Sequence, residues 1–238
     1  MKDIKLKYRR SKLGILWTLI EPILTTLVLA LVFESFRKRG NKEYSFVIYI
    51  LTGRLLYSFF SGATRAATKS IRTNGSMIKK VYVPKYIYPI ASILANYVIF
   101  IISMIVLVGA VIVCRVPLTW HVLEGIFPLV IILIMALGVG MILSTISVFF
   151  RDIEYLWGVI LTLVMYCSAI FYEMPENIEW ICKWNPLYAV IMNFRNAILF
   201  GKAPDIQELI YSIVVSLVSV VVGFYVFFKK QDEFILHI

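Results

Sequence analysis

Acidic residues, histidines and cysteines are all scarce in this chain. Its 238 residues include 14 aspartate and glutamate residues, two histidines and three cysteines. His121 falls in a short loop and His237 at the end of the chain, on opposite sides of the expected membrane, so they cannot form one site. The cysteines are odd in number and form no C-x-x-C pair, which indicates neither a disulfide framework nor a zinc site. We therefore expect no metal site and no catalytic cluster.

A phosphate-binding loop is also missing. The pattern G-x-x-x-x-G-K-[ST], whose backbone amides cradle nucleotide phosphates, occurs nowhere in the sequence. Any ATP-driven process must therefore use ATP and Mg²⁺ held by another polypeptide, and we expect no cofactor in this chain.

Apolar residues dominate the composition. They make up 61% of the chain, charged residues make up 16%, and the mean hydropathy is +0.86. Soluble domains are typically ~45–50% apolar and ~25% charged. A membrane-spanning helix needs ~20 mostly apolar residues, so the length accommodates about six spans and no separate soluble domain. We expect an all-α integral membrane protein with one transmembrane domain over residues 1–238. The expected spans are 13–36, 44–66, 87–114, 126–150, 155–172 and 209–228.

Three segments outside the spans complete the expected fold. Six basic residues between Lys2 and Lys12 run directly into the first span, which predicts a basic interfacial helix. Residues 67–86 form a polar, basic segment on the same side of the membrane. Residues 173–208 hold two short amphipathic stretches around Asn185-Pro186 and are too apolar for a simple loop, so we expect a re-entrant helical pair.

The basic residues also predict the orientation. The net charge of +10 does not indicate nucleic-acid binding, because lysine and arginine cluster beside the apolar runs. Fifteen of the 24 lysine and arginine residues fall on one side of the predicted membrane, eight on the other, and Arg54 lies inside a span. The richer side should be cytoplasmic. Both termini are then expected in the cytoplasm.

The 67–86 segment has a candidate binding face. Met77, Ile78, Val81 and Tyr82 have the spacing of one apolar helical face. A short amphipathic helix of this kind inserts into a groove of a partner protein. A basic loop that binds anionic lipid headgroups fits the pattern equally well.

Glu21 and Arg54 are charges within the predicted spans. Such charges are costly and are functional candidates by default. At 1.5 Å per residue, Glu21 lies about 12 Å and Arg54 roughly 16 Å deep from the same side. We expect that they either pair or face a common polar cavity, and an ion pair that merely joins the first two spans is the simplest interpretation.

Ala136, Gly140 and Ser144 place small residues at every fourth position of the fourth span. This pattern is typical of a face on which another helix packs closely. We expect the face to pack inside the subunit rather than against a second copy.

Five groups of residues, spread over the chain, are specific in their combination and order. They are Asp3-Ile4-Lys5-Leu6-Lys7-Tyr8-Arg9-Arg10-Ser11-Lys12-Leu13-Gly14 with Leu16-Trp17 and Pro22; Asn74 with Ile78-Lys79-Lys80-Val81-Tyr82-Val83-Pro84; Val148-Phe149-Phe150-Arg151-Asp152; Ser168-Ala169-Ile170-Phe171-Tyr172; and Asn185-Pro186-Leu187 with Phe194-Arg195. In these residues the chain resembles the membrane subunit of ABC-2 type exporters, in the branch that exports polysaccharides and polyol phosphates (O-antigen, capsule and teichoic acid permeases).

The resemblance implies a mechanism. It implies a homodimer of six-span subunits in the bacterial cytoplasmic membrane, driven by a separate ABC ATPase subunit that binds ATP and Mg²⁺. This chain would then have no enzymatic activity of its own. The substrate would be a lipid-linked glycan, usually carried on undecaprenyl pyrophosphate or a related lipid, and membrane lipids would be further partners.

The resemblance also implies roles for particular residues. The 67–86 segment would couple to the ATPase through Asn74, Met77, Ile78, Lys79, Lys80, Val81, Tyr82 and Pro84. Arg151 and Asp152 would form a cytoplasmic turn. Residues 173–208 would form a re-entrant gate on the outer side that includes Asn185, Pro186 and Arg195. From charge alone, we expect lipid phosphates to meet Lys7, Arg9, Arg10 and Lys12 near the inner leaflet.

Two departures separate the chain from the family pattern. It begins almost at the Asp3-Ile4 motif, where family members usually have a longer amphipathic gate helix, so the gate is short or the start is truncated. The usual Ser-Pro-Ile-Phe-Tyr sequence reads Ser168-Ala169-Ile170-Phe171-Tyr172. The proline that would kink the outer end of the fifth span is therefore missing.

Two other classes of protein fit the residues less well. An integral-membrane enzyme of lipid-linked glycan metabolism usually needs acid, histidine or metal clusters on one face, and the sequence shows none. A secondary transporter would favour internal repeats and more intramembrane acids than Glu21 alone. A neighbouring gene for an ATPase with a phosphate-binding loop would favour the exporter.

Overall fold

The computed structural model describes residues 14–34, 45–80, 83–172 and 184–237, and all of the secondary structure in these ranges is helical. This confirms the all-α class. With η marking short 3-10 or π-helical turns, the elements are η1 (Gly14–Leu16), α2 (Trp17–Glu34), α3 (Phe46–Thr73), α4 (Gly75–Ile78), α5 (Ile87–Val113), η2 (Trp120–Gly125), α6 (Ile126–Phe149), α7 (Ile153–Tyr166), α9 (Pro186–Arg195), η3 (Asn196–Phe200), α10 (Ile206–Lys230), η4 (Gln231–Glu233) and α11 (Phe234–His237).

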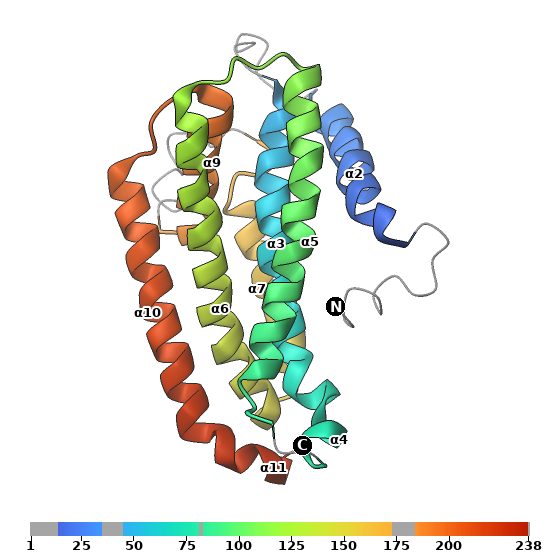
Figure 1. Cartoon of the computed structure of the whole chain (residues 1–238), viewed down its shortest axis with the longest axis vertical. Coiled ribbons are helices and arrows are strands. Elements are labelled where there is room, and N and C mark those ends of the chain that lie inside the picture. Colours follow the sequence, from blue (N-terminus) through green and yellow to red (C-terminus); the bar gives the residue numbers. More distant parts are fainter. Residues whose placement is uncertain (1–13, 35–44, 81–82, 173–183, 238) are drawn as a thin grey trace.

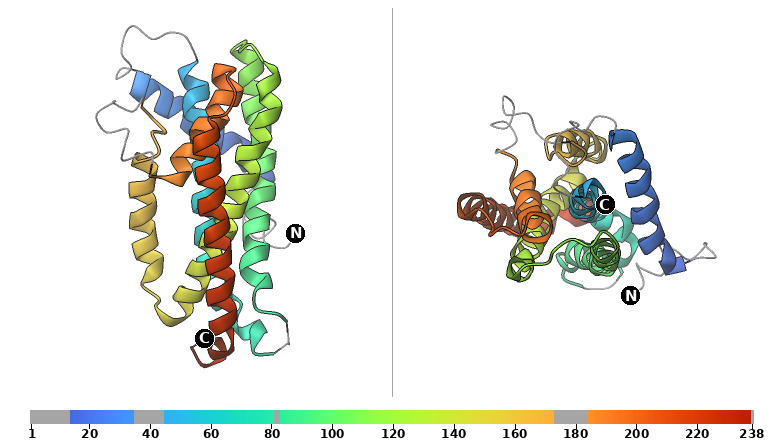
Figure 2. Two further views of the ribbon diagram at one scale, coloured as in Figure 1. Left: turned by 90° about the vertical axis from the view of Figure 1, so that its left-hand side faces the viewer. Right: turned by 90° about the horizontal axis from the view of Figure 1, so that it is seen from above.

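Four long helices, α3, α5, α6 and α10, run side by side along the long axis of the molecule (Figure 1). α3 packs against both α5 and α6, while α10 packs mainly on α6. α7 covers another side of α3, and α2 lies tilted against α3 and α5 (Figure 2). We call the end of the bundle that carries α4, α11 and the α6–α7 turn the α4 end. The opposite end, which carries η2, is the η2 end.

Four helical stretches are long and apolar enough to cross a membrane within the described residues. They are Phe46–Thr73, Ile87–Val113, Trp120–Phe149 and Ile206–Glu233. They correspond to the second, third, fourth and sixth spans expected from the sequence, so a protein with several membrane-spanning helices is confirmed.

The helix at the expected fifth span is shorter than predicted, whereas both ends of the expected first span lie outside the described residues. Within the described residues, the apolar helical stretches at these two spans are Trp17–Phe33 and Ile153–Tyr166; the fifth span was expected over 155–172. The 14 residues of α7 would extend only about 21 Å, less than the ~30 Å hydrocarbon core. Hydropathy alone overestimated the length of the fifth span, because the apolar run continues through Ser168–Tyr172 after α7 has ended. The six-span arrangement therefore stays a prediction.

The second helix is longer than the sequence indicated. It was expected to end at residue 66, but α3 continues to Thr73, so the first third of the 67–86 segment belongs to this helix. The hydroxyls of Thr68 and Ser70 donate hydrogen bonds back to the carbonyls of Thr64 and Ala67, each at 2.7 Å. Because these polar groups are satisfied within the helix, both residues are buried in the bundle.

Small residues allow the central helices to approach closely. A Cβ atom added to Gly140 would lie 2.7 Å from Ile93 Cδ1 and 3.0 Å from Ala67 Cβ, so the small-residue face of α6 packs against α3 and α5. The expectation of packing inside the subunit is confirmed. A second close contact joins α6 to α10, where a Cβ on Gly138 would lie 2.5 Å from the backbone carbon of Ser219. Tight packing of this kind replaces the hydrophobic effect as the force that holds helices together in lipid.

The outward faces of the helices are apolar. Ile105 and Val113 of α5, Val159 of α7 and Val221 of α10 are at least 61% exposed. In water such surfaces would cause aggregation, whereas lipid chains or a second membrane helix would cover them. The structure therefore agrees with the hydropathy of the sequence.

Candidate functional site

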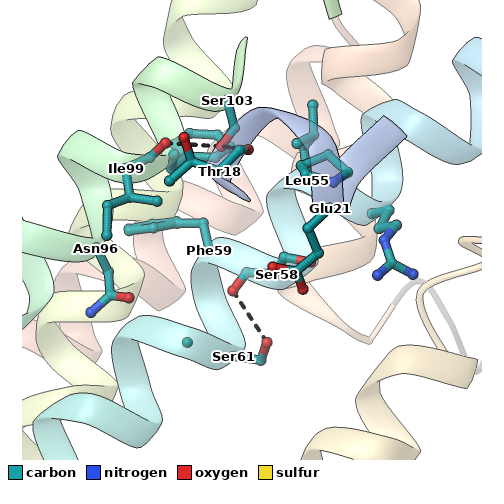
Figure 3. Close-up of a pocket in the computed structure, with 13 residues that line it drawn as sticks. Thr18, Glu21, Leu55, Ser58, Phe59, Ser61, Asn96, Ile99 and Ser103 are labelled. Atoms are coloured by element: carbon teal, nitrogen blue, oxygen red, sulfur yellow. Dashed lines mark hydrogen bonds between the residues drawn. The ribbon is translucent and has the colours of Figure 1, made fainter. Parts of the chain in front are cut away.

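A polar cavity lies between α2, α3 and α5 (Figure 3). Its volume is about 260 Å³, and it is lined by Thr18, Glu21, Pro22, Arg54, Leu55, Ser58, Phe59, Ser61, Gly62, Asn96, Ile99, Phe100 and Ser103. Arg54, Ser58 and Ser61 have helical spacing and therefore share one face of α3. Asn96 and Ser103 come from the facing side of α5. The cavity thus gathers hydroxyl, amide and charged groups at a depth where the outer surface of the bundle is apolar.

Glu21 and Arg54 both line this cavity. Glu21 is exposed and Arg54 is half-buried, and no ion pair joins them in the described part of the chain. Of the two expected arrangements, the structure therefore has the shared polar cavity rather than the direct pair. The cavity has room for several water molecules at ~30 Å³ each, and hydration lowers the cost of charges within a span.

Pro22 leaves a gap in the hydrogen bonding of α2 that α5 fills. A proline has no N–H, so the carbonyl of Thr18, four residues earlier, loses its helical partner. The hydroxyl of Ser103 donates to this carbonyl at 3.1 Å. The contact fixes α2 against α5 beside the cavity, and it satisfies a backbone group that lipid cannot.

Arg195, at the end of α9, is the largest fully buried side chain in the described residues. Its guanidinium donates to the carbonyls of Ala169 at 3.1 Å and Ile170 at 3.3 Å. A further hydrogen bond of 3.1 Å reaches the carbonyl of Tyr49 on α3. The phenol of Tyr49 donates to the same Ala169 carbonyl, at 3.1 Å, and to that of Tyr172, at 3.0 Å. Two side chains from separate helices thus hold the backbone just beyond α7.

The chain bends there without a proline. Ala169, which stands where the family pattern has proline, has φ 46°, a left-handed conformation that costs a non-glycine residue free energy. The carbonyl hydrogen bonds from Arg195 and Tyr49 supply the restraint that maintains it. The bend expected to depend on proline is therefore present by another means.

Asn185 and Pro186 start α9 next to this bend. The side-chain oxygen of Asn185 accepts a hydrogen bond from the N–H of Leu187 at 3.1 Å, which caps the helix, and Pro186 occupies its first position. The amide nitrogen of Asn185 donates to Ser168 Oγ at 2.9 Å. The structure therefore brings together the 168–172 motif and the predicted gate residues Asn185, Pro186 and Arg195. Of the two expected half-helices, the second corresponds to α9 and η3, whereas the first lies almost wholly outside the described residues.

The predicted coupling segment is organised differently from the expected amphipathic helix. Asn74 ends α3, and α4 has only four residues, Gly75–Ile78, followed by a turn. Ile78 is buried while Met77 is 53% exposed, so the two do not share an exposed apolar face. Gly75 at the start of α4 and the burial of Ile78 therefore outweigh the helical spacing of the apolar residues. Val81 and Tyr82 lie outside the described residues, while Lys79, Lys80 and Pro84 are exposed.

The segment packs on the end of the chain. Ile78 belongs to an apolar cluster, here called the α4-end cluster, that includes Ile71, Met141, Val148, Phe227 and Phe234. The Nζ atom of Lys85 donates to the carbonyl of Gln231 at 2.6 Å. Sequence reasoning missed the role of α11, although an apolar Phe-Ile-Leu run after Lys229-Lys230 was the available signal.

Of the remaining predicted residues, two are described and four lie outside the described residues. Arg151 and Asp152 are exposed in the α6–α7 turn at the α4 end. Lys7, Arg9, Arg10 and Lys12 precede the described residues. Within the described ranges, no group of three or more histidine, cysteine, aspartate or glutamate residues is arranged to hold a metal ion.

Comparison with known proteins identifies the family. Residues 1–199 match the ABC-2 type transporter family. The chain is 27% identical to an O-antigen export system permease protein RfbA of Klebsiella pneumoniae, with 98% of this chain and 90% of that protein covered. It is 21% identical to the polysialic acid transport protein KpsM of Escherichia coli (98% and 92% covered) and 23% identical to the capsule polysaccharide export inner-membrane protein CtrC of Neisseria meningitidis (94% and 86%). The chain therefore belongs to the ABC-2 type transporter family, as a membrane permease subunit.

Proposed function

We propose that this chain is the permease of an exporter that moves a lipid-linked polysaccharide or polyol-phosphate polymer across the bacterial cytoplasmic membrane. The observation that carries the proposal is the match over nearly the whole chain to permeases named for O-antigen, polysialic acid and capsule export. The energy for transport comes from a separate ABC ATPase that binds ATP and Mg²⁺, because this chain has no phosphate-binding loop of its own. An integral-membrane enzyme and a secondary transporter remain the alternatives, and neither is favoured by a particular contact.

The α4 end faces the cytoplasm in this proposal. Nine of the described lysine and arginine residues lie at or near this end: Arg65, Lys69, Arg72, Lys79, Lys80, Lys85, Arg151, Lys229 and Lys230. The η2 end has Arg115 and Lys202, with the buried Arg195 near it. Positive residues are retained on the cytoplasmic side of membranes, so this asymmetry supports the orientation and a cytoplasmic C-terminus.

The ATPase docks on the α4 segment. Met77, Lys79 and Lys80 are exposed there and offer one apolar and two charged contacts. Directly beneath them, Ile78 is anchored in the α4-end cluster, which includes residues of α6, α10 and α11. A movement of the ATPase that displaces α4 would therefore be transmitted to α6 and α10 through the packing of Ile78.

The bend held by Arg195 serves as the outer gate. It is near the η2 end, and α9 begins and ends inside the bundle against α3, α6 and α10. A second copy of the chain completes the path by covering part of the apolar outer surface, and the basic residues Lys7, Arg9, Arg10 and Lys12 meet lipid phosphates on the cytoplasmic side.

A cysteine cross-linking experiment tests the proposal. In a variant without Cys114, Cys167 and Cys182, Met77→Cys should cross-link to the co-expressed ATPase and Val113→Cys, exposed at the other end of α5, should not. Polymer export should require the nucleotide-binding lysine of the ATPase. Export that continues without ATP hydrolysis, together with no stable complex, would favour the secondary transporter.

A further inference from the structure

A second hollow lies on the outside of the bundle between α3 and α7, toward the α4 end. Its volume is about 220 Å³, and it is lined by Arg65, Thr68, Lys69, Glu154, Tyr155, Trp157 and Gly158. We call it the α3–α7 groove. It is separate from the cavity around Glu21, from the bend at Arg195 and from the α4 segment.

Three cations share one face of α3 here: Arg65 and Lys69 line the groove, and Arg72 lies next to it on the same face. Arg65, Lys69 and Arg72 are spaced four and three residues apart, so they are neighbours on the helix surface. Like charges at this spacing repel one another unless an anion lies between them. Glu154 at the start of α7 supplies one such anion: it pairs with Arg72, and its carboxylate lies 3.6 Å from Lys69 Nζ.

The carboxylate of Glu154 does not neutralise all of the positive charge at the groove. One carboxylate contacts both Lys69 and Arg72, while Arg65, which lines the same groove, has no ion-pair partner among the described residues. The side chain of Lys69 is 57% exposed and that of Glu154 only 15%. The buried part of the cluster is therefore neutralised by the protein, while Arg65 and Lys69 remain accessible to an external anion.

Hydrogen bonds fix the two helices that form the groove, and the space beside Gly158 is empty. The indole N–H of Trp157 donates to Thr64 Oγ1 at 3.0 Å, and the phenol of Tyr57 donates to the carbonyl of Leu161 at 2.9 Å. These two bonds hold α7 against α3. At Gly158 an added Cβ would meet no atom within 4 Å, so the space above this residue is free.

The surroundings resemble the boundary between lipid chains and headgroups. Beyond the groove, the outer face of α7 is apolar, with Val159 70% and Leu163 63% exposed. Tyr155, at the mouth, is 79% exposed and offers an aromatic face on which a sugar can stack. A phosphate held by Arg65 and Lys69 would therefore have an acyl or prenyl chain on one side and a sugar on the other.

We propose that the α3–α7 groove binds the phosphate-bearing headgroup of the lipid-linked substrate in the cytoplasmic leaflet, with Arg65 and Lys69 as the phosphate ligands. This assignment rests on the proposed function. The guanidinium of Arg65 can bind phosphate oxygens in a bidentate manner, and Lys69 adds a second charge-assisted hydrogen bond. Glu154 competes with the phosphate for Lys69, which weakens binding and allows the substrate to leave the groove.

Binding to the purified full-length chain in nanodiscs tests the proposal. The probes are undecaprenyl pyrophosphate, phosphatidylglycerol and inorganic pyrophosphate, with bound lipid measured by native mass spectrometry. The double variant Arg65→Gln/Lys69→Gln should raise the Kd for undecaprenyl pyrophosphate at least tenfold. Lys229→Gln, an exposed charge at the same end on α10, should leave the Kd within twofold.

Two further variants separate binding from folding. Arg65→Lys/Lys69→Arg keeps both charges and should restore binding to within threefold of wild type. Glu154→Gln removes the competing carboxylate and should tighten binding severalfold, whereas a purely structural role of Glu154 would weaken it. Gly158→Leu should obstruct the groove and weaken binding although every charge is retained.

The controls distinguish the sources of the phosphate. Inorganic pyrophosphate should displace the lipid in competition, and a failure to do so would overturn phosphate recognition. Equal affinity for phosphatidylglycerol would overturn the assignment to the substrate headgroup. A wild-type Kd for Arg65→Gln/Lys69→Gln, in a protein that still exports polymer with its ATPase, would refute the groove alone. Absence of ATP-dependent export by the wild-type complex would instead refute the proposed function.

Discussion

The guanidinium of Arg195 stacks on the ring of Tyr49, with 3.5 Å between its central carbon and the ring centroid, although the two residues are 146 positions apart. The contact is possible because Gly53 leaves room: a Cβ on this residue would lie 2.6 Å from Arg195 Nη2. Both side chains also bind the carbonyl of Ala169. The motif at 168–172 and the motif that includes Arg195 thus meet α3 around one buried charge.

Replacement of Arg195 by lysine should open this contact. A lysine ammonium cannot stack as a plane or reach three carbonyls as a fork, so hydrogen bonds to Ala169, Ile170 and Tyr49 are lost. We expect the free energy of unfolding to fall by about 2–3 kcal/mol. The thermal midpoint in detergent, measured by fluorescence-detected size exclusion, checks this result.

Two further variants isolate the cause. Tyr49→Phe keeps the ring and removes the hydroxyl, so it should cost about 1–2 kcal/mol. Lys202→Gln, an exposed cation seven residues after Arg195, should not change the midpoint. An Arg195→Lys protein with a wild-type midpoint would show that the hydrogen bonds contribute little.

The hydrogen bond from Ser103 to Thr18 should depend on Pro22. Ser103→Ala removes the donor to a carbonyl to which Pro22 offers no N–H, and we expect a loss of about 1 kcal/mol. In a Pro22→Ala background the alanine N–H can bond to Thr18, so the same substitution should cost markedly less. The measurement is a double-mutant cycle on the unfolding free energy, and additive effects would contradict the explanation.

The crossing of α6 and α10 should tolerate no side chain at Gly138. An added methyl group would lie 2.5 Å from the backbone of α10, which cannot rotate away, so Gly138→Ala should destabilise the protein by about 1–3 kcal/mol or more. Gly109→Ala on α5, where no atom lies within 4 Å, should be neutral or stabilising by up to about 1 kcal/mol. If both variants have the same thermal midpoint, the close approach at Gly138 is not a determinant of stability.

Local patterns in the sequence predicted the features that depend on local physics. Hydropathy identified four membrane-crossing helices, and the spacing of Ala136, Gly140 and Ser144 identified a packing face. The same methods misjudged the end of α3, because Thr68 and Ser70 count as polar although their hydroxyls are satisfied inside the helix. The composition of the segment does not show that these hydroxyls have hydrogen-bond partners inside the helix.

The sites depended on contacts that no local pattern contains. The motifs containing Ser168, Asn185 and Arg195 were recognised separately, but their convergence on the bend after α7 follows from how α9 enters the bundle. Likewise, the sequence identified Arg65 and Lys69 only as charges on the cytoplasmic side. Their proximity to Glu154 follows from the packing of α7 against α3. Tertiary packing determines such pairings, and it cannot be derived from the local pattern of one sequence.

The α4-end cluster leads to a final prediction about coupling. Phe234 of α11 is fully buried, belongs to the same cluster as Ile78, and lies in edge-to-face contact with Phe227, at 5.2 Å between centroids. Phe234→Ala should therefore loosen the support beneath α4 and cost about 3 kcal/mol.

The adjacent residue is a matched control. Ile235 is 49% exposed, so Ile235→Ala removes an apolar side chain from the same short helix without emptying the cluster. In the Met77→Cys background, Phe234→Ala should reduce both the cross-linking yield with the ATPase and polymer export severalfold, and Phe234→Leu should restore most of each. If Phe234→Ala and Ile235→Ala reduce cross-linking equally, α11 contacts the ATPase directly; if neither does, the cluster does not position α4. Only a selective effect of the buried residue would show that α11 supports the segment proposed as the docking site of the ATPase.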